Sequence, residues 1–523
     1  MIDFINITSD GHPCSELVER LLRRDTTLWS SDPEVRRAIG NRLGWLDAAA
    51  FMDRHGPRIQ GFAERARTEG YQQAVLLGMG GSSLAPEVYA ELFGGAPRSM
   101  ALIAVDSTSP GYVREVTERC ETAATLFIVS SKSGTTAETS ALDAHFFEWA
   151  RGRFDRPQDR FIAITDAESP LQSLANERGY REIFVNPTDI GGRFSALSFF
   201  GLVPAALSGV ELGALRARLP EPGAGSPEMA DACRLGIALG GLALQGKNKL
   251  TLHLSPTLAP AGAWIEQLID ESCGKQGTGI VAVPNEPRFE PDGYSSDRFF
   301  VVVHQGPDPA DEAWLDRLAG HGHPIARWRM DNLEQIGAEF YKWEVATALA
   351  GRELGINPFD EPDVNDSKAK TRALLEQAET APAMRADSPT ALAGLLAGAR
   401  QGDYLAVLAY LPPTPSNRER LRNWCEKLGS ETGRPCCPGF GPRYLHSSGQ
   451  LHKGGPNQGI FIVVTRDEGT DVPIPGQGHG FQSLIRAQAL GDLQVLKERG
   501  RRVVHFHLGE GNSSLDELIG AFP

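Results

Sequence analysis

The chain has 523 residues, of which 41% are hydrophobic and 23% charged, as in an ordinary soluble globular protein. This length exceeds what one hydrophobic core usually serves, so two or three domains are expected. The formal net charge of -14 argues against nucleic acid or an anionic membrane surface as a general partner. A small anion can still bind at a local site, because backbone N–H groups supply the required field.

Residues 1–14 lack the basic and apolar regions of a signal peptide, and a cytoplasmic location is expected. The least charged long stretch, residues 194–210, is interrupted by Gly201, Pro204 and Gly209. These interruptions favour a buried helix over a membrane span.

The chain contains seven cysteines with no repeating spacing, which fits a reducing cytosol. The neighbours Cys436 and Cys437 lack a second pair at the spacing of zinc ligands. No metal site is therefore expected.

The pattern of apolar residues changes along the first half of the chain. Residues 1 to about 50 are predicted to be helical. Short apolar runs separated by helix-length segments follow, as AVLLG, ALIAV, LFIVS, FIAIT and EIFVN at 74, 101, 126, 161 and 182. Five buried strands that alternate with helices predict a doubly wound α/β domain with a parallel sheet. Ligands bind beyond the carboxyl ends of the strands in this class of fold.

A Pro/Gly-rich linker is predicted from Leu219, and two further series of strands follow it. The second series begins at 250, 299 and 324 and leads into a helix from Leu333 to about Gly355, and the third begins at 404, 459 and 501. The predicted organisation is a helical segment (1–50), two α/β domains (51–218 and 226–378) and a C-terminal α/β extension (385–523).

The first candidate site is the Gly-rich turn GMGGSSLAP, which links a strand to a helix and includes Gly81 and Ser82. Backbone N–H groups in such a turn, together with the positive end of the helix, suit an anion. A dinucleotide-binding turn, with Asp106 on the ribose, is an alternative, although Ser83 stands where that motif has its third glycine. A purely structural turn is another.

A second loop after a strand, SSKSGTTAET, strengthens the prediction of a phosphate site. It presents four hydroxyls, those of Ser131, Ser133, Thr135 and Thr136, around Lys132. Hydroxyls, free amides and an ammonium group suit a phosphate monoester. A solvated Ser/Thr-rich turn is the alternative, but two such loops in one domain favour phosphate binding.

Five motifs together resemble the phosphoglucose isomerase family, whose members contain two sugar isomerase (SIS) domains. These motifs are GMGGSSLAP, SSKSGTTAET, DIGGRFSALSFFGLVPAAL, ESCGK and INPFDEPDVNDSK. The resemblance covers roughly residues 70 to 375 and implies aldose–ketose isomerisation through an enediol. That reaction needs a general base, a group that stabilises the enediolate and a way to open the sugar ring, but no metal or cofactor.

The resemblance implies roles for three charged residues. Glu271 matches the base, Arg193 the arginine that holds developing negative charge, and Lys368 the lysine near the ring oxygen. A solvated helix-end acid, a structural arginine and an ordinary surface lysine are the respective alternatives.

The ring-opening histidine departs from the family's order. The three histidines between Glu271 and Lys368 lack the expected H-x-x-x-Q context, whereas His446 and Gln450 have it further on in GPRYLHSSGQLHKGGP. We infer that this segment is relocated and folds back to the site, with His452 as the second candidate and a loop histidine as the structural alternative. The C-terminal part is similar to the isomerase half of fused transaldolase–phosphoglucose isomerase proteins.

A second departure is Glu361, where the family often has a glutamine that contacts phosphate. A carboxylate would repel a dianion unless it points away or pairs with a base, so Glu361 is left out of the predicted site. The overall expectation is a cytoplasmic homodimer that interconverts glucose 6-phosphate and fructose 6-phosphate. An isomerase that also accepts mannose 6-phosphate and a non-catalytic sugar-phosphate sensor are the alternatives.

Overall fold

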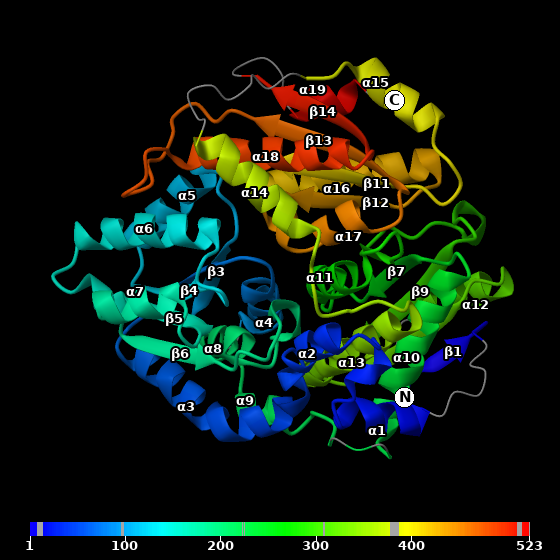
Figure 1. Ribbon diagram of the computed structural model, residues 1–523, viewed down its shortest axis with the longest axis horizontal. Coiled ribbons are helices and arrows are strands. Elements are labelled where there is room, and N and C mark those ends of the chain that lie inside the picture. Colours follow the sequence, from blue (N-terminus) through cyan, green and yellow to red (C-terminus); the bar gives the residue numbers. More distant parts are fainter. Residues whose placement is uncertain are drawn as a thin grey trace.

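The described part of the computed structural model contains three β-sheets, each covered by helices (Figure 1). It describes residues 1–7, 14–95, 99–221, 223, 225–306, 309–376, 386–509 and 515–521. The boundary predicted at 378–385, and two residues of the predicted linker, lie outside the described residues. The mixed α/β class with doubly wound parallel sheets is confirmed.

The first sheet has the order β3-β2-β4-β5-β6 and is entirely parallel. Its strands are the five predicted ones: β2 (Gln73–Gly78), β3 (Ala101–Val105), β4 (Thr125–Ser130), β5 (Phe161–Asp166) and β6 (Glu182–Asn186). Alternate residues along β2 and β4 belong to two different hydrophobic clusters, which accounts for their continuous apolar character. Helices α3 (Ala48–Thr68) and α8 (Phe199–Leu207) cover one face, and α5 (Pro110–Glu121) and α6 (Ala137–Arg151) cover the other.

The second sheet has the order β1-β10-β9-β7-β8. Strands β7 (Lys249–Leu254), β8 (Val281–Pro284), β9 (Arg298–Gln305) and β10 (Ile325–Met330) are parallel, and β1 (Asp3–Ile5) joins the edge antiparallel. The N-terminal segment is therefore not wholly helical as predicted, because its first residues extend this sheet. Helices α10 (Pro227–Leu244), α11 (Ala261–Cys273) and α13 (Ile336–Glu353) cover one face, and α12 (Pro309–Gly320) covers the other.

The third sheet has the order β12-β11-β13-β14 and is also parallel. It comprises β11 (Tyr404–Tyr410), β12 (Cys436–Phe440), β13 (Gly459–Arg466) and β14 (Arg502–Leu508). The sequence did not predict β8 or β12, because each is short and contains a proline. Such strands are tolerated at sheet edges, where both lie.

Helices cover both faces of the third sheet, and one of these faces also contacts the second sheet. One face packs on α15 (Pro389–Ala397), α16 (Pro415–Thr432) and α19 (Leu515–Gly520). The other packs on α17 (Gly449–Gly454), α18 (Phe481–Glu498) and on Val281 and Val283 of β8. The remaining helices are α1 (Cys14–Leu22), α2 (Pro33–Gly40), α4 (Leu84–Phe93), α7 (Pro170–Arg178), α9 (Leu212–Arg216) and α14 (Val364–Glu376).

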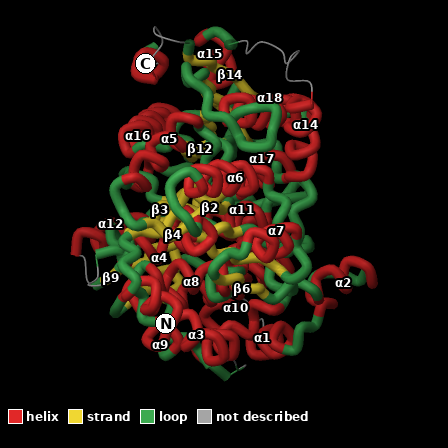
Figure 2. Tube along the Cα trace, turned by 90° about the vertical axis from the view of Figure 1, so that its left-hand side faces the viewer, coloured by secondary structure: helices red, strands yellow, loops and turns green. Residues whose placement is uncertain are grey.

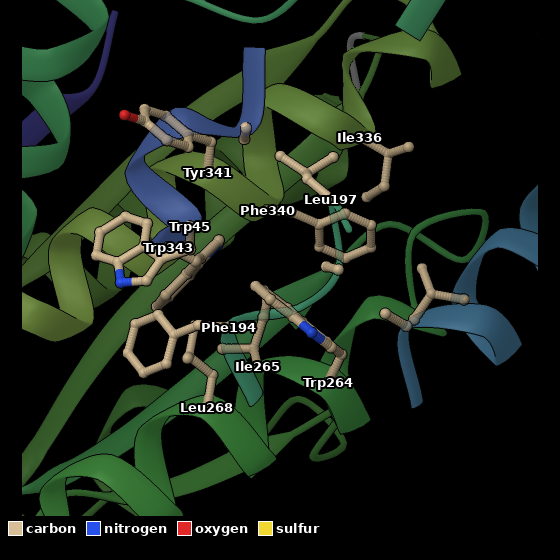
Figure 3. Close-up of a cluster of buried hydrophobic side chains, with 14 of the residues drawn as sticks. Trp45, Phe194, Leu197, Trp264, Ile265, Leu268, Ile336, Phe340, Tyr341 and Trp343 are labelled. Carbon is tan, nitrogen blue, oxygen red and sulfur yellow. The ribbon is translucent and has the colours of Figure 1, made fainter. Parts of the chain in front are cut away.

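A hydrophobic cluster between the first two sheets brings distant segments together (Figure 3). The ring of Phe194 lies 5.2 Å from that of Trp45 in the N-terminal segment and 5.2 Å from that of Phe359, measured between centroids. Ile265 and Leu268 of α11 belong to the same cluster. Because Phe194 directly follows Arg193, this packing also places the segment that carries the predicted arginine.

The carboxylate of Asp492 on α18 joins three other elements. It accepts hydrogen bonds from Ser367 Oγ of α14 at 3.1 Å and from Tyr444 Oη at 2.7 Å. It also lies 2.7 Å from Lys453 Nζ of α17, with both side chains buried. The helices α14, α17 and α18 lie side by side in both views (Figures 1 and 2).

We predict that Asp492→Ala lowers the free energy of unfolding by about 3 to 5 kcal/mol, because it leaves the buried ammonium of Lys453 without its counter-charge. Urea unfolding would measure the loss. The matched control is Glu498→Ala, which removes a half-exposed carboxylate 2.8 Å from Lys370 Nζ on the same pair of helices. Its expected cost is much smaller, because solvent screens an exposed ion pair. Equal losses in the two variants would contradict the prediction.

Candidate active site

A cavity of about 420 Å³ lies where the carboxyl ends of the first sheet face α11, α14 and the segment before α17. Ten of the eleven predicted site residues line it. They are Gly81, Ser82, Ser131, Lys132, Ser133, Thr136, Arg193, Glu271, Lys368 and His446. A larger cavity of about 690 Å³ between α4, α11, α16 and β12 contains none of them.

The first loop leaves β2 and turns through a short 3₁₀ segment into α4. Gly80 has a φ of +53°, in the left-handed region that favours glycine. A Cβ atom at Gly81 would lie 2.0 Å from the carbonyl oxygen of Gly192, so only glycine allows this close approach. The loop is thus held against the segment that carries Arg193.

The second loop leaves β4 and ends at Thr136, the N-cap of α6. Ser131 Oγ lies 3.0 Å from Thr136 Oγ1 and accepts a hydrogen bond from the backbone N–H of Gly134. Ser133 Oγ lies 2.9 Å from Thr135 Oγ1. Several hydroxyls and a helix N-terminus therefore converge at one end of the cavity, as an anion site requires.

Lys132 is held at the same end of the cavity. Its ammonium group pairs with Asp166 at the end of β5 and donates to the carbonyl oxygen of Thr188 at 2.9 Å. Burial raises the pKa of Asp166, and the adjacent Lys132 opposes that rise. Arg42, which the sequence analysis did not select, also lines this end and brings a second cation from the N-terminal segment.

Arg193 is 4% exposed, and its side chain connects three parts of the chain. Nε donates to Ser272 Oγ at 2.7 Å, and Nη2 donates to the carbonyl oxygens of Pro358 and Asp360 at 2.7 and 3.0 Å. Nη1 donates to Glu271 Oε1 at 2.9 Å and to Glu361 Oε2 at 3.0 Å. Burial disfavours the charged guanidinium, but these two carboxylates outweigh it and raise the pKa of Arg193.

Glu271 lies near the end of α11 and faces the cavity. It also accepts a hydrogen bond from Gln267 Nε2 at 3.1 Å. Burial raises the pKa of Glu271, Arg193 lowers it, and the negative charge of Glu361 raises it again. A carboxyl group whose pKa is raised in this way is suited to accept a proton near neutral pH.

His446 reaches the cavity from the C-terminal part of the chain. Its Nε2 lies 2.9 Å from Glu138 Oε1, and the same oxygen accepts from Gln488 Nε2 at 2.6 Å. Its carbonyl oxygen accepts from Gln267 Nε2 at 2.8 Å. The segment that carries His446 thus reaches the cavity, and Lys368 lines the cavity from α14.

The other two residues of the histidine motif do not line the cavity. Gln450 is buried, donates to the carbonyl oxygen of Gly274 at 2.9 Å and accepts from the backbone N–H of Asp363 at 2.9 Å. His452 is buried beside the aromatic ring of Phe461, and burial lowers its pKa to about 3. Gln450 therefore joins the histidine segment to neighbouring elements, and His452 is a core residue.

The sequence analysis did not select several charged or polar residues of the site, among them Arg42, Glu138, Asp166, Gln267 and Glu361. Glu138 stands inside a motif that had already been selected, so its place after the hydroxyl-rich loop was an available signal. Glu361 was left out of the predicted site because its negative charge would repel a phosphate unless it points away or pairs with a basic group. In the structure it pairs with a basic group. For Arg42 and Gln267 no motif pointed to the site.

The described residues lack two further features. No group of three or more histidine, cysteine, aspartate or glutamate side chains there could hold a metal ion. No helix in the described part of the chain is long and apolar enough to cross a membrane.

Comparisons with known proteins agree on one family. The family model described as phosphoglucose isomerase matches residues 58–212. A glucose-6-phosphate isomerase of Heliobacterium modesticaldum is 30% identical over 391 residues, which is 64% of this chain and 87% of the relative. One from Symbiobacterium thermophilum is 31% identical over 392 residues, 64% of this chain and 86% of the relative.

Two solved structures share the fold. A hypothetical protein from Thermus thermophilus has a TM-score of 0.60 at 24% identity and covers 72% of this chain and 100% of its own. A glucose-6-phosphate isomerase from Chlamydia trachomatis has a TM-score of 0.52 at 20% identity and covers 73% of this chain and 86% of its own. With the sequence relatives and the site geometry, these findings show that the chain belongs to the phosphoglucose isomerase family of isomerases.

Proposed function

We propose that the chain catalyses the reversible isomerisation of glucose 6-phosphate and fructose 6-phosphate through an enediol intermediate. The observation that carries this proposal is the cavity itself. Two hydroxyl-rich loops lie at one end, and a base, an arginine and a histidine–carboxylate pair from distant segments line the same space. The names of the sequence relatives support the same activity.

The two loops would hold the phosphate group of the substrate. Ser82, Ser131 and Thr136 would supply hydroxyls, the start of α6 would supply backbone N–H groups, and Lys132 would supply positive charge. Binding energy from this group, which takes no part in the reaction, would position the sugar carbons for proton transfer.

His446 would open the sugar ring. Ring opening removes a proton from the anomeric hydroxyl and delivers one to the ring oxygen, so the C–O bond breaks and the carbonyl forms. A histidine can perform both transfers near neutral pH, and the carboxylate of Glu138 would orient its ring. Lys368 would stabilise negative charge at the ring oxygen from the opposite element, α14.

Glu271 would then move the proton between the two carbons. It would take the proton from C2 of the open aldose, and electrons would pass to the carbonyl oxygen to form the enediolate. The guanidinium of Arg193 would stabilise this oxygen, and protonated Glu271 would return the proton to C1. In the same sequence the proton on O2 is transferred to O1, so that the C2 carbonyl and the C1 hydroxyl of the ketose form and no proton is gained or lost overall.

The homodimer and the cytoplasmic location remain predictions, and we further propose that the reaction serves glycolysis and gluconeogenesis.

We predict that Glu271→Gln lowers kcat about 10²- to 10⁴-fold, because it removes the base but preserves the shape of the side chain. Binding of fructose 6-phosphate, followed by calorimetry, should remain. The control is Glu266→Gln, a second acid on α11 that lines the larger cavity. Equal activity of wild type and Glu271→Gln would assign the base to another group, and binding by wild type without turnover would favour the sensor.

We predict that His446→Ala loses about 10- to 100-fold in rate on the cyclic sugar phosphate but little on an aldose phosphate that lacks the ring-forming hydroxyls. Glu138→Gln should show the same selectivity with a smaller loss, because it acts through the histidine. His321→Ala, at an exposed histidine outside the cavity, is the control. Equal losses on both substrates would exclude a role confined to ring opening.

We predict that Lys132→Met raises KM about 10- to 100-fold and affects kcat less, because a charge-assisted contact is lost and Asp166 is left unpaired beside the phosphate. Steady-state kinetics with Lys370→Met, a partly exposed lysine on α14, as control would measure this. An unchanged KM would place the phosphate elsewhere.

A further inference from the structure

Glu361 brings an additional carboxylate into the cavity, at a position where the family often has a neutral glutamine. It follows α13 in the segment that leads to α14, and its side chain is 44% exposed. Its Oε2 accepts a hydrogen bond from Arg193 Nη1 at 3.0 Å. This carboxylate lies in a site that must bind a phosphate dianion. Its role, as inferred below, rests on the function proposed above.

The arrangement at Arg193 gives Glu361 a specific place. A guanidinium carries five N–H donors, and here each has an acceptor. Three go to Ser272 and to the carbonyl oxygens of Pro358 and Asp360, and the two on Nη1 divide between Glu271 and Glu361. One nitrogen therefore lies between two carboxylates, and the guanidinium has no free donor with which to bind Glu271 in a bidentate manner.

Other charged groups surround Glu271, Arg193 and Glu361. Lys275 pairs with Asp360 at 2.8 Å, and Arg42, Lys368 and His446 line the same cavity. Burial raises the pKa of Glu361, but the adjacent Arg193 outweighs it, so the pKa is lowered. Glu361 is therefore a permanent negative charge at neutral pH, whereas the pKa of Glu271 is raised.

We propose that Glu361 is a positioning residue for the proton transfer: it holds Arg193 beside Glu271 while sharing its charge, so that Glu271 remains a competent base. An arginine paired with one carboxylate alone would stabilise the ionised form and make it a weaker base. The negative charge of the second carboxylate offsets this stabilisation of the ionised form. It also adds negative charge near a phosphate dianion, so the arrangement favours proton transfer at some expense in substrate affinity.

The test compares wild type, Glu361→Gln and Glu361→Asp by the pH dependence of kcat in both directions. In Glu361→Gln the amide oxygen can still accept from Arg193, but the charge is gone. We expect its acidic limb to move to lower pH by about one unit, because a nearby like charge no longer raises the pKa of the base. The plateau kcat should fall about 3- to 10-fold, because a weaker base transfers protons more slowly, and KM should fall as well.

Two comparisons isolate the charge as the cause. Glu361→Asp retains the charge and should return the acidic limb towards that of wild type. Glu16→Gln, on the exposed side of α1, changes the net charge equally outside the cavity and should leave the profile unchanged. Since kcat refers to the bound substrate and all variants share it, ionisation of the sugar phosphate does not alter the comparison.

The outcomes separate this inference from the proposed function. If wild type isomerises the sugar phosphate and Glu361→Gln has an unmoved acidic limb, the inference is wrong, even if KM falls. If wild type binds but does not turn over, the proposed function itself fails. Should Glu361→Gln melt more than a few degrees below wild type, Glu361→Ser removes the same charge with a smaller side chain and must show the same shift.

Discussion

The active site depends on the burial of one cation, the guanidinium of Arg193. A buried charge is costly unless it is paired and every donor has an acceptor. The chain meets this requirement with groups from α11 and from the segment after α13, which surround a residue carried by the first sheet. The same contacts that satisfy the cation therefore hold Glu271, Glu361 and the two larger α/β units together.

A second group of hydrogen bonds holds together the other side of the cavity. Glu138 follows the phosphate-type loop of the first sheet, whereas His446 and Gln488 belong to the C-terminal part. Asp492, one turn further along α18 than Gln488, joins the histidine segment to the helix that carries Lys368. Helix α18 thus positions both groups proposed for ring opening, and the third sheet serves as the platform that holds this helix against the other two.

The comparison of sequence and structure shows where pattern reasoning holds. The longer strands were predicted because both their faces are buried, which leaves a continuous apolar run. Strands β8 and β12 were not predicted because each is short and contains a proline, which an edge strand tolerates, and β1 was not predicted because it has only three residues. The phosphate-type loops were predictable because backbone geometry demands glycine and small hydroxyl side chains locally. Gln450 was misplaced because spacing from His446 says nothing about which face of a short helix meets the cavity.

The sequence by itself determined the fold class, the two loops and the identity of the acid, arginine, lysine and histidine, since these depend on local patterns and short motifs. Only the tertiary structure decided how they combine. Residues Arg193 and Glu361 are far apart along the chain, and only the fold brings a guanidinium nitrogen of one within hydrogen-bond distance of a carboxylate oxygen of the other. A carboxylate that looks repulsive in sequence becomes a partner once a buried cation lies within hydrogen-bond distance, because electrostatic energy depends on distance and burial rather than on order along the chain.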